Sequence, residues 1–322
     1  MTTAPAGKSH VAPPPLDVSE VHYAYGNTRA VNGVSFQVHP GEIFGLLGPN
    51  GAGKTTTISM IAGLLKPARG QVLIFGDEAS DRSGRARARM GIVPQDIALY
   101  EDLTVRENLR FWARLYGLKG AALARGVEVS LDEVGLADRS RDKVGALSGG
   151  LKRRLNLAVG LVHGPALLLL DEPTVGIDPQ ARMRILDVVR AQAAAGRAIV
   201  YTSHYLEEAE QICDRLAIVD HGEVLACGTV EELRRMVGEG PVVHVKGDVT
   251  AERMRGIAAA VPGIALLSSD GDRTSFAAVD AASCSGLVRE LFAAGGGIED
   301  LRVLEPTLQT LFLKLTGREL RD

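Results

Sequence analysis

The sequence predicts an α/β protein with a parallel-sheet core, followed by a second, smaller α/β domain. Two short apolar runs, Ile43–Leu47 and Leu167–Leu170, are typical of strands buried on both faces, as in a parallel sheet. A glycine-rich turn and then a helical pattern follow the first run, in the order strand, turn, helix. After residue 240 the pattern becomes strand, helix, strand, strand, helix, strand, which suits a ferredoxin-like unit.

The phosphate loop is the turn Gly48–Thr55, whose sequence GPNGAGKT matches GxxxxGK[ST] between a strand and a helix. Gly51 and Gly53 let the backbone wrap around phosphates, Lys54 reaches the β- and γ-phosphates, and the Thr55 hydroxyl is a ligand for Mg²⁺. A chance match in a glycine-rich chain is the alternative, and the strand and helix on either side argue against it. We expect nucleotide contacts from Gly48, Pro49, Asn50, Gly51, Ala52, Gly53, Lys54, Thr55 and Thr56.

Two acidic residues follow the second buried strand. Asp171 and Glu172 emerge at its carboxyl end, where ligands bind in open α/β sheets. Asp171 is suited to the Mg²⁺ shell, and Glu172 to activating the water that attacks the γ-phosphate. A solvated acidic pair at the start of a loop is the alternative for these two residues taken alone.

Two further polar residues follow predicted strands. His204 comes directly after the strand Ala198–Ser203, and the helix Pro179–Ala195 is the crossover before that strand. His204 is a candidate donor to the γ-phosphate, although a lone histidine there is usually a cap or surface residue. Gln95, after the strand "GIVPQ", is a candidate for contacting metal and water, and by itself it is a loop glutamine.

A second anion-binding helix start is predicted at Ser148, Gly149 and Gly150. These residues precede an apolar pattern with helical spacing, and the free N–H groups of such a helix start point at an anion. One chain thus carries two separate places suited to phosphate.

These motifs together resemble the ATP-binding-cassette (ABC) ATPase family, over roughly Leu16–Val237. The segment "ALSGG", Ala146–Gly150, is similar to the family's signature motif, and the motifs occur in the family's order. The resemblance implies ATP and Mg²⁺ as cofactors, with Thr55, Gln95 and Asp171 near the metal and Lys54, Gln95, Glu172 and His204 in catalysis. It also implies an antiparallel β subdomain and a helical subdomain around the parallel sheet.

The resemblance further implies an aromatic residue that stacks on adenine, and Tyr25 fits that position better than Tyr23. It implies a head-to-tail dimer, in which Ser148 and Gly150 of one chain close on the ATP held by the phosphate loop of the other. Leu151 stands where the family often has Gln, and Val175–Asp178 departs from the common loop sequence. Neither change removes a proton-transfer or metal group, so we expect an active ATPase.

Between Gln95 and the signature the pattern is helical. Val105, Leu109, Trp112 and Leu115 are predicted on one face of a helix, with Trp112 a packing residue. In the family this insert lies beside the groove that receives a permease's cytoplasmic coupling helix. The basic run Arg82–Met90 is predicted to be a solvated loop, with contact to membrane head groups as the alternative.

Composition sets limits on partners and location. The chain has 322 residues, 46% of them hydrophobic, and a formal net charge of −3. A net charge so close to zero gives no general argument for binding nucleic acid, and we expect no nucleic-acid partner. Cys213, Cys227 and Cys284 are widely spaced and read as reduced thiols. The longest apolar runs are five residues, far below the ~20 that a membrane span needs. We therefore expect a separate permease, with this chain peripheral on the cytoplasmic face of the cell membrane.

Three segments are predicted: a disordered lead at 1–15, without the apolar stretch of a secretory signal, an ABC domain at 16–238, and an accessory α/β domain at 239–322. The closing segment "EPTLQTLFLKLTGREL" is similar to that of ATPases serving type-2 exporters, such as those for daunorubicin, nodulation factors and polysaccharides. We expect the motor of such an exporter rather than a translation or repair ATPase, because the chain has a single cassette without a long insert. A soluble ABC ATPase of the iron–sulfur assembly type is the alternative.

Overall fold

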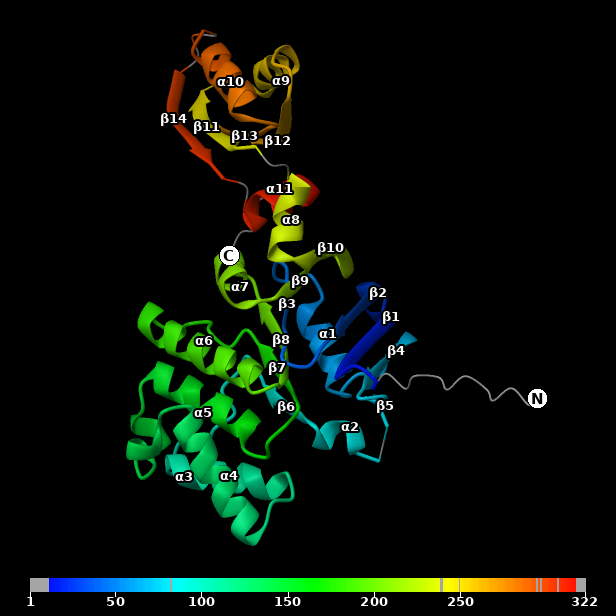
Figure 1. Cartoon of the computed structure of the whole chain (residues 1–322), viewed down its shortest axis with the longest axis vertical. Coiled ribbons are helices and arrows are strands. Elements are labelled where there is room, and N and C mark those ends of the chain that lie inside the picture. Colours follow the sequence, from blue (N-terminus) through cyan, green and yellow to red (C-terminus); the bar gives the residue numbers. More distant parts are fainter. Residues whose placement is uncertain are drawn as a thin grey trace, which may run out of the picture. The chain divides into compact units, whose positions relative to one another are not determined.

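The computed structural model describes residues 12–81, 83–237, 240–248, 250–293, 295, 297–305 and 307–316 (Figure 1). Most of the predicted disordered lead, residues 1–11, lies outside them. The chain forms two compact units. Among the described residues, the first unit comprises those within 12–23, 33–42 and 56–200, and the second comprises those within 24–32, 43–55 and 201–316.

The antiparallel sheet has the strand order β2-β1-β4-β5. β1 pairs with β4 in antiparallel register, with Leu16 opposite Ile74, and β4 pairs with β5 in the same sense. Apolar residues of β1 alternate with more exposed ones, because successive side chains of a strand point to opposite faces. The bounds are β1 Leu16–Tyr25, β2 Thr28–Val38, β4 Arg69–Ile74 and β5 Asp77–Glu78.

The core sheet has the strand order β10-β9-β3-β8-β7-β6. β6 runs parallel to β7, β3 runs parallel to β9, and β10 is an antiparallel neighbour of β9. All residues of β3, β7 and β8 are buried, which confirms the predicted strands buried on both faces. The bounds are β3 Ile43–Leu47, β6 Met90–Val93, β7 Leu167–Asp171, β8 Ala198–Ser203, β9 Arg215–Asp220 and β10 Glu223–Thr229.

Helices of the first unit include α3, which begins at a capping box: Thr104 accepts from the Glu107 amide and the Glu107 carboxylate accepts from the Thr104 amide. Val105 and Leu109 are buried as predicted, but Leu115, the last residue of α3, is 63% exposed. Successive residues of a helix are about 100° apart, and this places Leu115 outside the buried face of α3, whereas Ala113 lies on that face. The bounds are α2 Arg85–Ala88, α3 Val105–Leu115, α4 Gly120–Glu133, α5 Gly149–Leu161 and α6 Pro179–Ala194.

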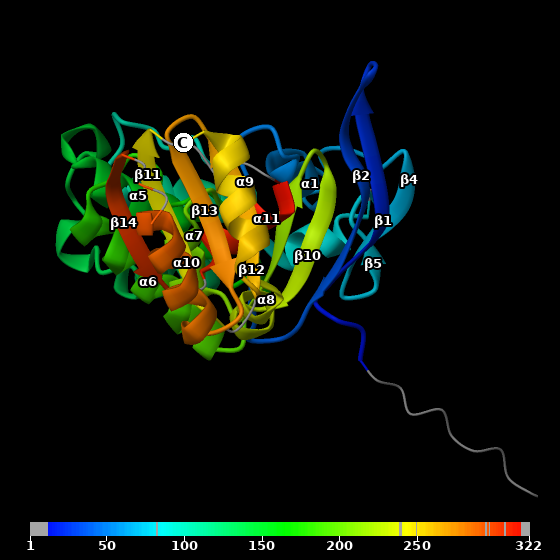
Figure 2. The same ribbon diagram turned by 90° about the horizontal axis from the view of Figure 1, so that it is seen from above.

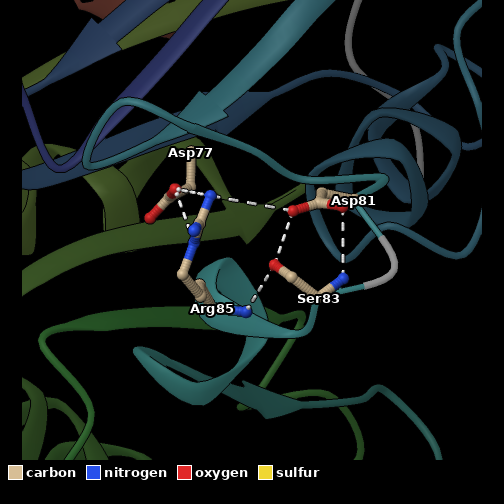
Figure 3. A network of polar contacts seen from close by, with 4 residues as sticks. All are labelled: Asp77, Asp81, Ser83 and Arg85. Atoms are coloured by element: carbon tan, nitrogen blue, oxygen red, sulfur yellow. Dashed lines mark hydrogen bonds and ion pairs between the residues drawn. The ribbon is translucent and has the colours of Figure 1, made fainter.

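One arginine of the basic run between β5 and β6, Arg85, pairs with acidic neighbours. Arg85 donates through Nε and Nη2 to Asp77 at 3.0 and 2.9 Å, and its Nη2 also lies 3.9 Å from Asp81 (Figure 3). Asp81 also accepts from the backbone N–H of Ser83 at 3.1 Å. Arg85 is therefore paired within the protein, although its side chain is 69% exposed, and it begins the short helix α2 where the sequence predicted a loop.

The C-terminal sheet has the strand order β12-β13-β11-β14, with α9 and α10 on one face (Figure 2). This βαββαβ arrangement confirms the ferredoxin-like prediction. Val243, Phe276 and Leu287 form its core between the strands and the two helices. The bounds are β11 Val242–Asp248, α9 Ala251–Ala260, β12 Ile264–Asp270, β13 Arg273–Ala278, α10 Ala281–Ala293 and β14 Gly297–Leu304.

The last helix, α11 (Leu308–Thr316), contacts α7 (Leu206–Ile212) and α8 (Val230–Val237) within the second unit. Glu210 of α7 accepts from the backbone N–H of Leu308 and from Arg234 of α8, both at 2.7 Å. Within the described residues, no helix combines the length and the apolar character needed to cross a membrane. α1, which follows the phosphate loop, spans Lys54–Ile61.

Candidate functional site

The phosphate loop of the second unit is closed on its own lysine. Lys54 is buried, and its Nζ donates to the carbonyl oxygens of Gly48 at 2.7 Å and Pro49 at 3.3 Å. The side chain of Thr55, by contrast, is exposed at the start of α1. A loop that already surrounds an ammonium group, with N–H groups at a helix start, is suited to an anion.

Two positions of the phosphate loop require glycine. A Cβ at Gly48 would lie 2.1 Å from the carbonyl oxygen of Val219, and one at Gly53 would lie 2.3 Å from that of Ala30. Gly53 also has φ +101°, a conformation that other residues rarely adopt. The sequence pattern therefore reflects close backbone packing as well as room for phosphate.

The adenine-stacking candidate is the last residue of β1. Tyr25 is 55% exposed, whereas Tyr23 is half-buried. An exposed ring is available to stack on a base, so this difference favours Tyr25, in agreement with the order of preference from the sequence.

The acidic pair of the first unit lies at the end of β7. Asp171 is its last residue, and both Asp171 and Glu172 are buried. Glu172 has φ +46°, in the left-handed region, and a turn follows in which the Val175 amide donates to the Glu172 carbonyl at 3.3 Å. A non-glycine residue held there costs about 1–3 kcal/mol, and such residues cluster at functional sites.

Gln95 and Glu172 are brought together. The Gln95 side-chain amide donates to Glu172 Oε2 at 3.4 Å, although 77 positions separate them. This contact places an amide beside the carboxylate that the sequence nominated as the base.

Arg153 anchors both the loop that contains Gln95 and the turn that follows Glu172. This role was not predicted from the sequence. The arginine projects from α5, is buried, and donates to the carbonyl oxygens of Pro94, Gln95 and Val175. Burial lowers the pKa of this guanidinium, and the nearby Asp96 acts in the opposite direction. Asn156, three residues after Arg153 in α5, accepts a hydrogen bond from the backbone N–H of Ala98 at 3.2 Å. The signature helix therefore positions the loop that carries Gln95.

The signature segment opens α5. Ser148 is the N-cap residue, but its side chain makes no capping hydrogen bond and is exposed, so its hydroxyl faces outward from an open helix start. A Cβ at Gly150 would lie 2.5 Å from the Cβ of Ala181 in α6. Glycine at this position therefore lets the starts of α5 and α6 approach each other.

His204 directly follows β8 and is half-buried. Its ring centroid lies 4.1 Å from that of Tyr205, and α7 begins at Leu206. The nominated residues thus fall into two groups: Gln95, Ser148, Asp171 and Glu172 in the first unit, and Tyr25, Lys54, Thr55 and His204 in the second.

Comparison with known proteins identifies the family. The family model described as ABC transporter matches residues 31–175. The linearmycin resistance ATP-binding protein LnrL of Bacillus subtilis (strain 168) is 42% identical over 314 residues, covering 95% of this chain and 100% of that protein. The Nod factor export ATP-binding protein I of Cupriavidus pinatubonensis is 40% identical over 312 residues, covering 95% and 92%.

The chain belongs to the ABC transporter ATP-binding proteins. Like these relatives, it is the ATP-binding subunit of an ABC exporter, and it is an ATPase that works with a membrane permease. The soluble iron–sulfur alternative is therefore wrong, because the relatives that cover almost the whole chain are transporter subunits.

Solved structures agree on the fold of the ABC ATPase. The structure of the ATP-binding subunit of an ABC transporter superposes with TM-score 0.62 at 35% identity, covering 69% of this chain and 92% of that one. CbiO1 of Clostridium perfringens, part of the transporter complex cbiONQ, superposes with TM-score 0.64 at 27% identity, covering 77% and 96%.

Tyr100, in the loop before α3, and half-buried Phe111 of α3 form an aromatic patch of this ABC ATPase, and Ile97 is exposed in the same loop. Tyr100 is 46% and Ile97 is 39% exposed, and the Tyr100 and Phe111 rings meet edge to face at 4.7 Å. Trp112 packs edge-on against Phe111 at 5.7 Å, which agrees with its predicted packing role. The exposure of Ile97 and Tyr100, in the loop after Gln95, was not foreseen from the sequence.

Proposed function

We propose that two copies of this chain form a head-to-tail dimer with two shared ATP sites, and that ATP binding and hydrolysis there drive export through a type-2 permease. In each site the phosphate loop of one copy holds the nucleotide, with Lys54 on the β- and γ-phosphates and Tyr25 on adenine. Ser148, Gly149 and Gly150 of the other copy close on the γ-phosphate. The ABC domain is assigned to 16–238 and the accessory domain to 239–322.

The observation that carries this proposal is the state of Ser148. A serine at a helix start ordinarily caps its own helix, and this one does not. Its exposed hydroxyl and the free N–H groups of α5 form an anion site directed outward. A partner's γ-phosphate supplies the anion that such a site lacks within its own chain.

Mg²⁺ is proposed as the metal of this site. Among the residues that the structure describes there is no cluster of three or more His, Cys, Asp or Glu side chains that could hold a metal by itself. Mg²⁺ bound with nucleotide needs fewer protein ligands, because phosphate oxygens and waters supply the rest. Thr55, Asp171 and Gln95 offer hydroxyl, carboxylate and amide oxygens, which are the donors that Mg²⁺ prefers, and the bound ion neutralises phosphate charge.

Glu172 acts as the base in the proposed mechanism. Its carboxylate accepts a proton from the water that attacks the γ-phosphate, while Gln95 donates to the carboxylate and keeps it oriented. His204 donates to the γ-phosphate, and Lys54 moves from its loop carbonyls to phosphate oxygens. Each step needs its group at a defined position, which Arg153 provides for the two loops of the first unit.

The aromatic patch is proposed as the surface that receives the cytoplasmic helix of the permease. Exposed aromatic and aliphatic side chains beside a helical subdomain are enriched at protein interfaces. This contact makes the chain peripheral to the cytoplasmic face of the membrane, held there by the permease.

A disulfide test addresses the shared site directly. One chain carries Ser148→Cys and a second carries Asn50→Cys, both in a background where the exposed Cys227 is replaced by Ser. Since each chain has only one new thiol, a Ser148–Asn50 crosslink must join two copies. We expect it to form with ATP and not without it. Ala195→Cys, exposed after the end of α6, is the matched control for Ser148→Cys. Crosslinking equal to that control overturns the shared site.

A further inference from the structure

A cavity of about 430 Å³ lies on the face of the C-terminal sheet opposite α9 and α10. Val243 and Val245 of β11 pack in the core with those helices. Since side chains alternate along a strand, His244 and Lys246 point to the other face, and both line the cavity. A volume of this size lies within the range of sites for small molecules.

The floor of this cavity is polar and carries basic groups from three neighbouring strands. In the sheet register His244 stands between Ser275 of β13 and Arg302 of β14, and Lys246 stands beside Arg273. His244 Nδ1 lies 2.8 Å from the Ser275 hydroxyl. Antiparallel neighbours in direct register have side chains close together, so these groups form one continuous surface.

The basic groups differ in how far neighbouring carboxylates neutralise them. Lys246 pairs with Glu299 at 2.5 Å and with Asp272 at 3.6 Å, and Arg302 donates to Asp300 at 2.8 Å. No hydrogen bond or ion pair joins the side chain of Arg273 to a residue that the structure describes, while its backbone stands opposite Lys246 and Asp270 in the sheet register. The uncompensated positive charge of the floor is therefore centred on Arg273, with Arg302 available as a second guanidinium.

One wall of the cavity has a different character. Leu313 of α11 and Leu304 at the end of β14 line it, together with the Thr310 hydroxyl. Three acidic residues also line the cavity: Glu207 and Glu305, which are exposed to solvent, and Asp300, which pairs with Arg302. A ligand that fits would place a negative group on the floor and an apolar part against the leucines.

We propose that this cavity binds a small organic oxyanion, a phosphate or carboxylate on a partly apolar body, through Arg273 and Arg302. Guanidinium groups bind such oxyanions through paired, charge-assisted hydrogen bonds. Two sources share this chemistry: a soluble metabolite and the head group of an anionic lipid.

The test uses the full chain with Lys54→Ala, so that the phosphate loop does not compete for the probe. Hexyl phosphate is titrated calorimetrically, with hexanol as the neutral counterpart. Vesicles of phosphatidylglycerol in phosphatidylcholine are tested by flotation. The pocket variant is Arg273→Gln with Arg302→Gln, both exposed positions, and the matched control is Arg289→Gln, which is 79% exposed on α10. These readouts require no ATP hydrolysis, so their result is independent of the proposed ATPase mechanism.

We expect hexyl phosphate to bind the Lys54→Ala chain and its Arg289→Gln variant with the same affinity. Its affinity for the pocket variant should be lower by about tenfold or more. If the pocket variant loses hexyl phosphate binding while its flotation is unchanged, the ligand is a soluble molecule. If the pocket variant, and not the control, also loses flotation, the ligand is a lipid head group. Either result supports the site. Equal binding by the pocket and control variants overturns it. The proposal is also overturned if no probe binds at concentrations up to about 10 mM, because any remaining affinity would then be very weak.

Discussion

Gln95 and Glu172 meet through a side-chain hydrogen bond, Nε2 to Oε2 at 3.4 Å, across 77 positions of the chain. Glu172 is also held in a left-handed backbone conformation, at φ +46°. Residues in this backbone conformation cluster at functional sites, and the contact with Gln95 orients the carboxylate of this one.

Replacing Glu172 by Gln is expected to abolish most hydrolysis and leave ATP binding intact, because the amide keeps the shape but cannot accept the proton. Loss of a positioned base slows turnover about 10²–10⁴-fold. The measurement is steady-state phosphate release beside equilibrium binding of ATP. Glu231→Gln, at an exposed position of α8, is the control. A Glu172→Gln rate within a few-fold of wild type would place the base elsewhere.

Replacing Arg153 by Leu is expected to lower the free energy of unfolding by roughly 1–3 kcal/mol, because buried carbonyls lose their donor. The ATPase rate falls as well, since the loop carrying Gln95 loses its support. Lys152→Met is the matched control: Lys152 pairs at 2.6 Å with Glu101, which is 67% exposed, and such a pair contributes about 0–1 kcal/mol. Urea unfolding of both variants decides, and equal losses would contradict the anchoring role of Arg153.

The pH dependence of stability includes a contribution from His163. Its Nε2 lies 3.1 Å from the Met90 carbonyl oxygen, and its ring stacks on Tyr116 at 3.8 Å. Burial lowers the pKa of this imidazole, and the hydrogen bond to Met90 acts in the opposite direction. The folded state therefore favours neutral His163, while the unfolded chain protonates near its ordinary pKa of about 6.5.

Stability should accordingly fall as the pH drops from about 6.5 through the folded-state pKa of His163, because the unfolded state then binds more protons. His163→Gln retains a donor for the Met90 carbonyl and removes the titration, so its unfolding midpoint in urea should depend less on pH. His39→Gln, at an exposed position, should behave as wild type. An unchanged pH slope in His163→Gln would exclude this histidine as the cause.

The residues predicted from sequence are those whose role depends on local pattern. The strands around Leu46 and Leu169 were recognisable because burial on both faces requires an unbroken apolar run, here Ile43–Leu47 and Leu167–Leu170. The phosphate loop was recognisable because its glycines and lysine are adjacent in the chain. The order of the C-terminal elements likewise followed from their alternation.

Arg153 was not predictable in this way. Lys152, Arg153 and Arg154 form an ordinary basic run, and only the fold shows that the middle one is buried with acceptors 22 to 59 positions away. The left-handed backbone of Glu172 and the basic floor around His244 are similarly products of long-range packing. Leu115 is exposed because it is the last residue of α3 and lies beyond the edge of the face that α3 buries.

Replacing Tyr100 by Glu is expected to release the ATPase from membranes that contain its permease, because a charge replaces an exposed ring at the proposed docking surface. The backbone N–H of Tyr100 keeps its bond to Asn108, so the fold should be retained. The readouts are co-sedimentation with permease-containing membranes and ATPase rate in solution, which should stay within about twofold. Leu64→Glu, at a position that is 76% exposed, is the control. Equal membrane association of both variants would place the docking surface elsewhere.

The shared ATP site makes a prediction about which mutations complement each other. Ser148→Arg blocks the open start of α5, and Lys54→Ala removes the grip of the phosphate loop. A heterodimer of these two single variants has both defects in one site and keeps the other site intact. A heterodimer of wild type with a chain carrying both changes has one defect in each site, and so keeps neither.

Sites contained within one chain would give the reverse order, because the wild-type copy would then keep a complete site and neither single variant would. Each heterodimer is isolated through two different affinity tags, one on each chain, and all chains carry Glu172→Gln. Closure is measured as the change in hydrodynamic radius of the dimer when ATP is added. Closure by the single-variant pair and not by the wild-type–double-variant pair establishes that Ser148 serves the partner's ATP. The opposite result refutes it. Failure of both pairs, with heterodimers shown to be present, means that closure needs two intact sites, and the disulfide between Ser148→Cys and Asn50→Cys then decides which copies share them.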